Sequence, residues 1–244
     1  MDIKDLYEKR KAYVDSARDN NFEEGLLNLL TKLYPDNAHF IYELLQNAED
    51  TGATKILFEL DKEQLIFSHN GLRAFSFKDV ESITSIGNST KTDDINSIGK
   101  FGVGFKAVFS YTKTPKIYSQ DISFEILDLF IPKKIPSINI NQEYSTVMVF
   151  PFDHKDKTAK KAFEEVSNHL DNLSDVTLLF LSNINEIAWD IGNGISSLKR
   201  VDDVDNKIQI HNSKTLNTSY WLQYKKFLNG SSKLYVAIAY ELRQ

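Results

Sequence analysis

The sequence predicts an α+β fold, and two kinds of pattern carry that prediction. Apolar residues recur at helical spacing at the start of the chain, from Ile3 to Arg18. Short β-rich runs bounded by turn residues follow, such as TKILFEL at 54–60 and EQLIFSHN at 63–70. We expect residues 1–151 to form one α+β core. The strand-rich residues 152–244 are then a C-terminal extension of that core or the start of a further domain.

The elements can be placed along the chain from their periodicity and their turn residues. Two further helices are expected, in FEEGLLNLLTKLYPDNA before Pro35 and in NAHFIYELLQNAEDT, with Asn37 as N-cap and Gly52 ending the helix. The runs around Asp61–Lys62 predict a hairpin. A short helix in SFKDVESITSIG is capped by Ser76 or Asp79. The remaining predicted elements are strands in PKIYS, DISFEIL and STVMVFPF, a charged helix from Lys155, and strands in LLFLSNINEIAWDI, NKIQIHN and KLYVAIAYEL.

Composition excludes several classes of function. The formal net charge of the 244 residues is −5, with lysine and arginine scattered, which gives no electrostatic footprint for nucleic acid. There is no cysteine, which excludes disulfides and thiolate metal sites. No signal peptide and no apolar run of about 18 residues is found, so we expect a cytoplasmic protein. The chain ends in a strand-like run, which favours a piece of a longer protein.

Three polar residues lie on one face of the predicted helix FIYELLQNAED. Glu43, Asn47 and Asp50 are spaced by four and three, while Leu44, Leu45 and their apolar neighbours need burial. This face is either a solvent-exposed helix edge or the wall of a ligand cleft. In a cleft, Asn47 would offer a neutral oxygen to Mg²⁺, and Glu43 could hold a water as general base.

The stretch IGKFGVGFKAVF has glycines at 99, 102 and 104 and leads into a predicted helix from about Phe105. It does not fit a P-loop, because Phe101 follows Gly99–Lys100, and it does not fit the dinucleotide fingerprint. Glycines let backbone amides approach a ligand, and the helix N-terminus favours an anion, to which Lys106 could add charge. The alternative is a helix entry packed tightly on a strand. A turn at His69–Asn70–Gly71 is a weak signal on its own.

Taken in order, these stretches resemble the GHKL ATPase superfamily, which includes the ninety-kilodalton heat-shock chaperones, MutL proteins, type II topoisomerases and sensor histidine kinases. The resemblance rests on ELLQNAED (43–50), HNG (69–71), GKFGVGF (99–105) and YSTVMVF (144–150). Together with SIGNSTK and LLFLSNI, the wording is most similar to the sacsin-type, chaperone-like ATP-binding domains. The resemblance covers roughly residues 38–150, and the rest more loosely.

The resemblance implies a Bergerat fold, a two-layer α/β sandwich whose mixed sheet is covered by helices on one face, with ATP held under a lid. Glu43 then matches the catalytic glutamate, Asn47 the Mg²⁺ ligand, and Asp50 the supporting acid of the same box. Gly71 matches the glycine under the adenine, and Thr146 matches the threonine of the adenine site.

The lid box is implied to wrap the phosphates with its backbone amides. Its glycines are Gly99, Gly102 and Gly104, and Phe101 and Phe105 would pack the lid. Two lysines could reach a phosphate, Lys91 in NSTK and Lys106 after the lid. The remaining lid-box positions that would contact the nucleotide are Lys100 and Val103.

His69 departs from the family pattern, which usually has an aspartate that accepts a hydrogen bond from the adenine amino group. A neutral imidazole can accept through one nitrogen, whereas the protonated ring cannot. The expectation is therefore a nucleotide affinity that falls as the pH drops through about 6.5. Weaker adenine selectivity is the alternative, or a contact from the neighbouring Asn70 instead.

We therefore expect a Mg²⁺-dependent ATP-binding domain with slow ATP hydrolysis that acts as a conformational switch in a larger chaperone-like or defence-related protein. The alternative is an ATP-binding module without hydrolysis that controls dimerisation or partner binding. A histidine kinase is disfavoured, because none of the five histidines begins a dimerising helix pair. A role on DNA is disfavoured by the acidic balance. The implied partners are ATP or ADP, further domains of the same chain and a second copy, with no membrane.

Overall fold

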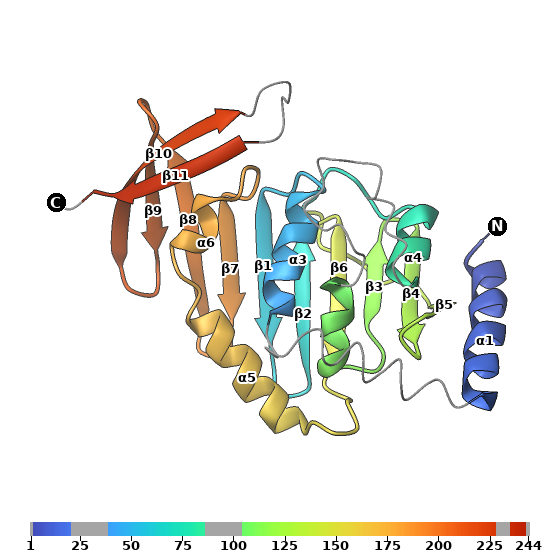
Figure 1. Ribbon diagram of the computed structural model, residues 1–244. Helices are drawn as coiled ribbons and strands as arrows, with labels where there is room; N and C mark the ends of the chain where they lie inside the picture. The colour runs from blue at the N-terminus through green and yellow to red at the C-terminus, as the bar shows by residue number, and fades with distance from the viewer. Residues whose placement is uncertain (1, 21–38, 86–103, 228–234, 243–244) are drawn as a thin grey trace.

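The computed structural model describes residues 2–20, 39–85, 104–227 and 235–242, and it shows a single eleven-stranded mixed sheet with helices laid against part of it (Figure 1). This confirms the α+β class. The described helices cover only part of the sheet, so the architecture is strand-rich rather than a clear two-layer sandwich. Within the described residues, no helix is long and apolar enough to cross a membrane.

The helices lie at the start, over the middle and before the C-terminal strands. They are α1 (Ile3–Asp19), α3 (Phe40–Glu49), α4 (Phe77–Ile83), the 3₁₀ helix η1 (Gly104–Ser110), α5 (Ala159–Asp171) and α6 (Val176–Leu179). The strands are β1 (Lys55–Leu60), β2 (Gln64–His69), β3 (Lys116–Ser119), β4 (Ile122–Leu127), β5 (Ile131–Lys134), β6 (Thr146–Pro151), β7 (Glu186–Asp190), β8 (Ile195–Asp202), β9 (Lys207–Asn212), β10 (Asn217–Phe227) and β11 (Tyr235–Glu241).

The sheet runs in the order β11-β10-β9-β8-β7-β1-β2-β6-β3-β4-β5. All neighbouring strands are antiparallel except β1 and β7, which are parallel, with Ile56 opposite Ile187. The strands that follow Pro151 therefore extend the same sheet from the free side of β1. Helix α1 packs on β5 at one end, and β11 lies at the other end (Figure 1).

Local sequence signals set most of the element boundaries. Helix α4 starts with a capping box in which Ser76 and Asp79 exchange side-chain and backbone hydrogen bonds, so both predicted caps are used. The Asp61 side chain accepts from the backbone amides of residues 63 and 64 and closes the predicted β1–β2 hairpin. After α3 the chain turns at Gly52, whose φ of +74° favours glycine.

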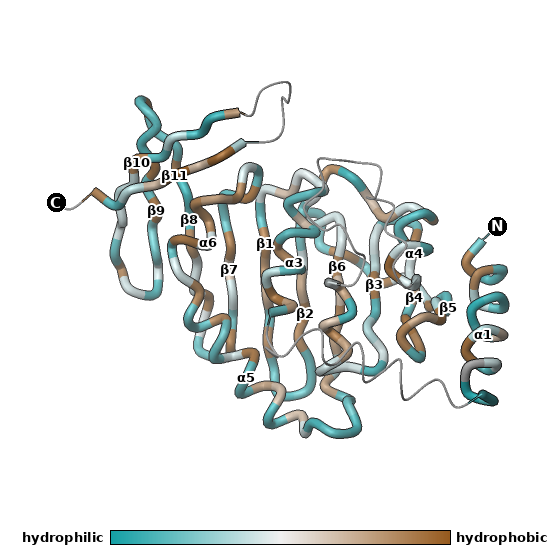
Figure 2. The backbone as a smooth tube through the Cα atoms, viewed as in Figure 1, coloured by the Kyte–Doolittle hydropathy of each residue, from teal (hydrophilic) through white to brown (hydrophobic). Residues whose placement is uncertain are grey.

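The core lies between the central strands and the helices. Alternate residues of the strands are buried, for example Phe58 on β1 and Phe67 on β2, whose rings lie 5.0 Å apart. Phe40 of α3 packs on Tyr111 and Phe150, which joins the helix to the sheet. Figure 2 shows the hydrophobic residues running along the central strands and the helices laid over them.

Some expected elements differ from the structure. The segment after the glycine-rich turn is the seven-residue 3₁₀ helix η1 rather than the expected α-helix. Strands β5, β8 and β10 were not predicted, and β5, with the sequence IPKK, is only four residues long. The second predicted helix, in FEEGLLNLLTKLYPDNA, lies outside the described residues.

Lys106 on η1 points into the core instead of toward a phosphate, which corrects the expected role of this lysine. Its ammonium donates to the carbonyl oxygens of Ile83 (2.7 Å) and Leu129, and it lies 4.7 Å from the ring centre of Phe130. Burial lowers the pKa of Lys106 to about 7, and the nearby Arg10 contributes in the same direction. Lys106 therefore joins the end of α4 to the β4–β5 turn.

The buried lysine predicts a pH-dependent stability. An unfolded lysine keeps its proton up to about pH 10.5, whereas folded Lys106 loses it near pH 7. Between these pH values the unfolded state binds more protons than the folded state, so the folded state becomes less stable as the pH falls toward 7. We expect the free energy of unfolding to rise by about 2 kcal/mol from pH 7 to pH 9, and Lys106→Met to remove that rise. Urea unfolding at several pH values measures it. Lys199→Met, at an exposed lysine, should keep the wild-type slope, and an unchanged slope in Lys106→Met would contradict the assignment.

Candidate functional site

Helix α3 presents a polar side next to its buried apolar face. Glu43 and Asn47 lie one turn apart and are partly exposed, whereas Leu44, Leu45 and Ala48 are buried. Within the described part of the chain, no residue hydrogen-bonds to the Asn47 side chain, so its amide oxygen is available to a ligand. Asp50 caps the end of the helix, and its backbone amide donates to Gln46 O at 3.0 Å.

The Glu43 carboxylate lies between a histidine and a glycine. Its Oε1 is 3.8 Å from Nε2 of His39, one turn earlier. On the other side, a Cβ added to Gly104 would lie 1.9 Å from Glu43 Oε2. Only glycine therefore fits at position 104 without displacing the carboxylate. The structure thus brings together Glu43 and the last glycine of the predicted lid box.

The polar end of three neighbouring strands lies near this helix. His69 at the end of β2 is the register partner of Thr146 at the start of β6, and Thr146 in turn faces Ser119 at the end of β3. The hydroxyl groups of Thr146 and Ser119 are 2.8 Å apart, and all three side chains are buried. The two residues matched to the adenine site, His69 and Thr146, are therefore direct neighbours in the sheet.

His69 is held neutral by burial, which lowers the pKa of its imidazole to about 4. Its Nδ1 accepts a hydrogen bond from the backbone amide of Gly71 at 3.1 Å, so the neutral ring carries its proton on Nε2. The nitrogen that accepts is thus engaged inside the turn. This corrects two expectations: an acceptor nitrogen offered to adenine, and a titration near pH 6.5.

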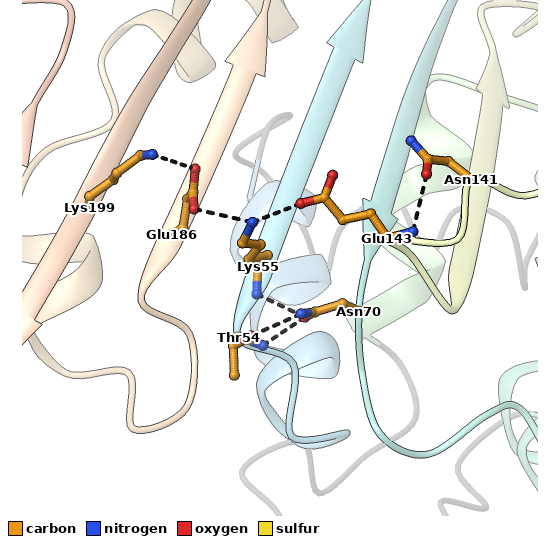
Figure 3. A network of polar contacts seen from close by, with 7 residues as sticks. All are labelled: Thr54, Lys55, Asn70, Asn141, Glu143, Glu186 and Lys199. Carbon is orange, nitrogen blue, oxygen red and sulfur yellow. Dashed lines mark hydrogen bonds and ion pairs between the residues drawn. The ribbon is translucent and has the colours of Figure 1, made fainter.

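Asn70 does not supply the missing adenine contact, because both ends of its amide are engaged in the sheet. Its oxygen accepts from the backbone amides of Thr54 (2.8 Å) and Lys55 (2.9 Å), and its nitrogen donates to the Thr54 hydroxyl (Figure 3). The side chain therefore fastens the start of β1 to the end of β2. Its role in the structure is to join these strands, and the amide oxygen expected to accept from adenine already accepts two hydrogen bonds.

Position 71 has no room for a side chain larger than that of glycine. A Cβ at this position would lie 2.0 Å from the Thr51 hydroxyl and 3.0 Å from His69 Nδ1. The Ser145 hydroxyl donates to Gly71 O at 2.7 Å and holds the turn against the start of β6. The turn after β2 is thus fixed from both sides, and its backbone is presented in one conformation.

The glycine-rich stretch is described only from Gly104 onward. Phe105 is buried and its ring centre lies 6.2 Å from that of Phe150, so it packs in the core, whereas the resemblance implied packing against the lid. The other expected nucleotide contacts in this region lie outside the described residues, namely Lys91, Gly99, Lys100, Phe101, Gly102 and Val103.

Several residues that shape this region were not singled out from the sequence. His39 precedes Glu43 by four residues, a spacing that could have been recognised. Ser119 and Ser145 depend on strand pairing and had no local signal. Glu49 is buried on α3, and its carboxylate accepts hydrogen bonds from residues 182–184, which no pattern near Glu49 indicates.

The donor set can be compared with the needs of a magnesium ion. Among the described residues, no group of three or more histidine, aspartate or glutamate side chains could hold a metal. Mg²⁺ often keeps several waters and takes one or two protein oxygens together with substrate phosphates. A single available amide oxygen at Asn47, next to the Glu43 carboxylate, fits that mode of binding.

Comparison with known proteins gives relatives in three organisms. Human sacsin is 32% identical over 109 residues, which is 38% of this chain and 2% of sacsin. The protein NO VEIN of Arabidopsis thaliana is 28% identical over 168 residues, 56% of this chain and 6% of that protein. A putative type II restriction enzyme, HgiDII, of Herpetosiphon aurantiacus is 27% identical over 113 residues, 43% of this chain and 18% of that protein.

These similarities cover only a small part of each relative, since the chain spans at most 18% of the length of these three proteins. The family comparison covers more of the chain itself. The family model described as the Sacsin domain matches residues 21–147, which contain α3, the β1–β2 hairpin, the glycine-rich stretch and the start of β6. On this match over more than half of its length, the chain belongs to the sacsin domain family.

Proposed function

We propose that this chain is an ATP-binding domain of the GHKL type that hydrolyses ATP slowly with Mg²⁺ and acts as a conformational switch within a larger protein. The observation that carries the proposal is the position of Glu43. Its carboxylate lies between His39 and the close-packed Gly104, and Asn47 lies one turn further along α3. A base and a neutral oxygen ligand on one helix face are the groups that phosphoryl transfer to water needs.

Each residue has a separate task in this proposal. Asn47 supplies an amide oxygen to Mg²⁺, which when bound neutralises charge on the phosphates. Glu43 orients a water and takes its proton, and His39 Nε2 lies 3.8 Å from Oε1 of the same carboxylate. In this proposal the adenine lies against the buried Thr146, at the start of β6, and the fixed turn at Gly71, after β2. The Bergerat arrangement of helix over sheet belongs to the same proposal.

A second candidate is an ATP-binding module that does not hydrolyse ATP. The observation that favours it is His69, whose acceptor nitrogen is engaged by Gly71. The neutral ring then offers a donor where the family offers an acceptor, so adenine is recognised less selectively. Hydrolysis and binding are separate measurements, so the two candidates can be told apart.

The first test compares two variants of α3. Asn47→Ala removes the amide oxygen, so we expect Mg²⁺-dependent ATP binding to weaken at least about tenfold in calorimetric titration. Glu43→Gln keeps the shape of the side chain but removes the base. It should keep ATP binding and lose turnover on the order of a hundredfold or more, measured as phosphate release. Gln46→Ala, on the same helix, is the control. An ATP affinity that changes neither with Mg²⁺ nor in Asn47→Ala would rule out the proposed site.

Gly104 provides a second test of the site. An added methyl group would lie within 1.9 Å of Glu43 Oε2, and the flexible end of that side chain can move aside. We therefore expect Gly104→Ala to change the melting temperature little but to lower turnover at least about tenfold, because a base displaced by about 1 Å loses its alignment. Wild-type turnover in Gly104→Ala would show that the Glu43–Gly104 contact has no part in hydrolysis.

The neutral His69 gives a third prediction. With a pKa of about 4, the ring stays uncharged throughout the mildly acidic range. ATP affinity should therefore be constant between pH 7.5 and about pH 5.5, once the protonation of ATP itself is corrected for with ADP and AMP as parallel ligands. A fall in affinity centred near pH 6.5 that disappears in His69→Gln would mean that the ring titrates in contact with the nucleotide.

A further inference from the structure

Glu49 is a buried carboxylate with a complete set of hydrogen-bond donors. It is 8% exposed, and it lies on α3 two residues after Asn47. Its Oε1 accepts from the backbone amides of Ser182 and Asn183, both at 2.8 Å, and from Asn183 Nδ2 at 3.1 Å. Its Oε2 accepts from the backbone amide of Ile184 at 3.0 Å. All these donors come from the loop between α6 and β7.

Arg200 on β8 holds the end of α6 and the start of the same loop. One guanidinium nitrogen, Nη1, donates to the carbonyl oxygens of Leu178 (3.1 Å), Leu179 (3.3 Å) and Leu181 (2.6 Å). The carboxylate thus accepts from amides of the loop, and the guanidinium donates to carbonyls at the end of α6 and the start of the loop. Both charged groups are largely buried, so a break in either set would leave buried polar groups without partners.

This contact fixes the rotation of α3 about its axis. Residues two apart on a helix point in different directions, so Glu49 faces the loop while Asn47 faces away from it. The apolar face allows the helix to slide or roll on the sheet, whereas four directed hydrogen bonds do not. The direction of Glu43 and Asn47 therefore depends on residues 182–184, which are more than 130 positions further along the chain.

We propose that Glu49 is a positioning residue that sets the orientation of Glu43 and Asn47 and couples the candidate nucleotide site to the β7–β11 part of the sheet. This inference rests on the proposed function. Glu49 touches no ligand in this role. It acts through the helix, and a movement of α3 on nucleotide binding reaches the α6–β7 loop and Arg200 through the same hydrogen bonds.

The experiment measures both directions of this coupling in the 244-residue chain. The first readout is the Mg²⁺ concentration needed for half-maximal ATP binding. The second is hydrogen–deuterium exchange of peptides that contain Ser182, Asn183 and Ile184, with and without Mg²⁺-ATP. These are the amides that donate to Glu49, so they report on the contact itself.

The test variant is Glu49→Gln, which keeps the size of the side chain and one acceptor oxygen but sets an NH₂ group against an N–H donor. Asn183→Ala removes the Nδ2 hydrogen bonds to Glu49 and leaves the three backbone donors in place. It weakens the contact from the loop side at an exposed residue, so it carries the test if Glu49→Gln does not fold. Asp175→Asn is the matched control. It also removes the charge of a carboxylate in the same part of the chain, which accepts from Ser219 and Asn212 but not from α3.

In the wild-type chain we expect ATP to change the exchange of residues 182–184. In Glu49→Gln we expect that response to be lost and the Mg²⁺ requirement to rise by on the order of tenfold, even after correction for the folded fraction. In Asn183→Ala, which keeps the three backbone donors, we expect both changes in the same direction but smaller. Asp175→Asn should lower the melting temperature without either change. A purely structural Glu49 would behave like Asp175, and that result overturns the inference alone. No Mg²⁺-ATP binding by the wild-type chain overturns the proposed function and this inference together.

Discussion

The burial of the apolar face of α3 against the sheet is the constraint on which the geometry of the candidate site depends. Phe40, Ile41, Leu44, Leu45 and Ala48 are each at most 2% exposed. Full burial of a large apolar side chain contributes about 2 kcal/mol, so this face holds the helix firmly on the strands. The polar residues of the helix are then forced to its flanks. Glu43 and Asn47 lie on one flank, and Glu49 lies against the α6–β7 loop.

The elements that could be predicted from the sequence are those whose signals are local. The β1–β2 hairpin follows from two alternating runs around Asp61, and α4 follows from Ser76 and Asp79, because each pattern is complete within a few residues. The shared face of Glu43 and Asn47 also follows from helical spacing alone. The contact between Gly104 and Glu43 does not follow from spacing, because it joins two elements far apart in the chain.

The roles that could not be predicted depend on distant neighbours. A lysine after a glycine-rich turn looks like a phosphate ligand, yet Lys106 is turned inward by the carbonyls of Ile83 and Leu129, which belong to other elements. Asn70 beside a glycine looks like a ligand contact, yet the start of β1 takes up its amide. The pKa of His69 depends on burial that exists only in the folded sheet. Spacing along the chain contains none of this information.

The residues after Pro151 support the sheet on which α3 and the candidate site lie. Strand β7 pairs with β1, and without it β1 would be an open edge beneath α3. On the outer face, Lys55 bridges Glu143 and Glu186, and Glu186 also binds Lys199 of β8 (Figure 3). These ion pairs are half-exposed, so each contributes little, on the order of 0 to 1 kcal/mol.

The buried Glu49 is different, because a chain ending at residue 151 would leave its carboxylate facing none of its four donors. A carboxylate stripped of its partners in this way must take up water or shift the helix that carries it. Because that helix also carries Glu43 and Asn47, we infer that a sheet completed by β7 is a condition for an ordered site, rather than an addition to a finished core.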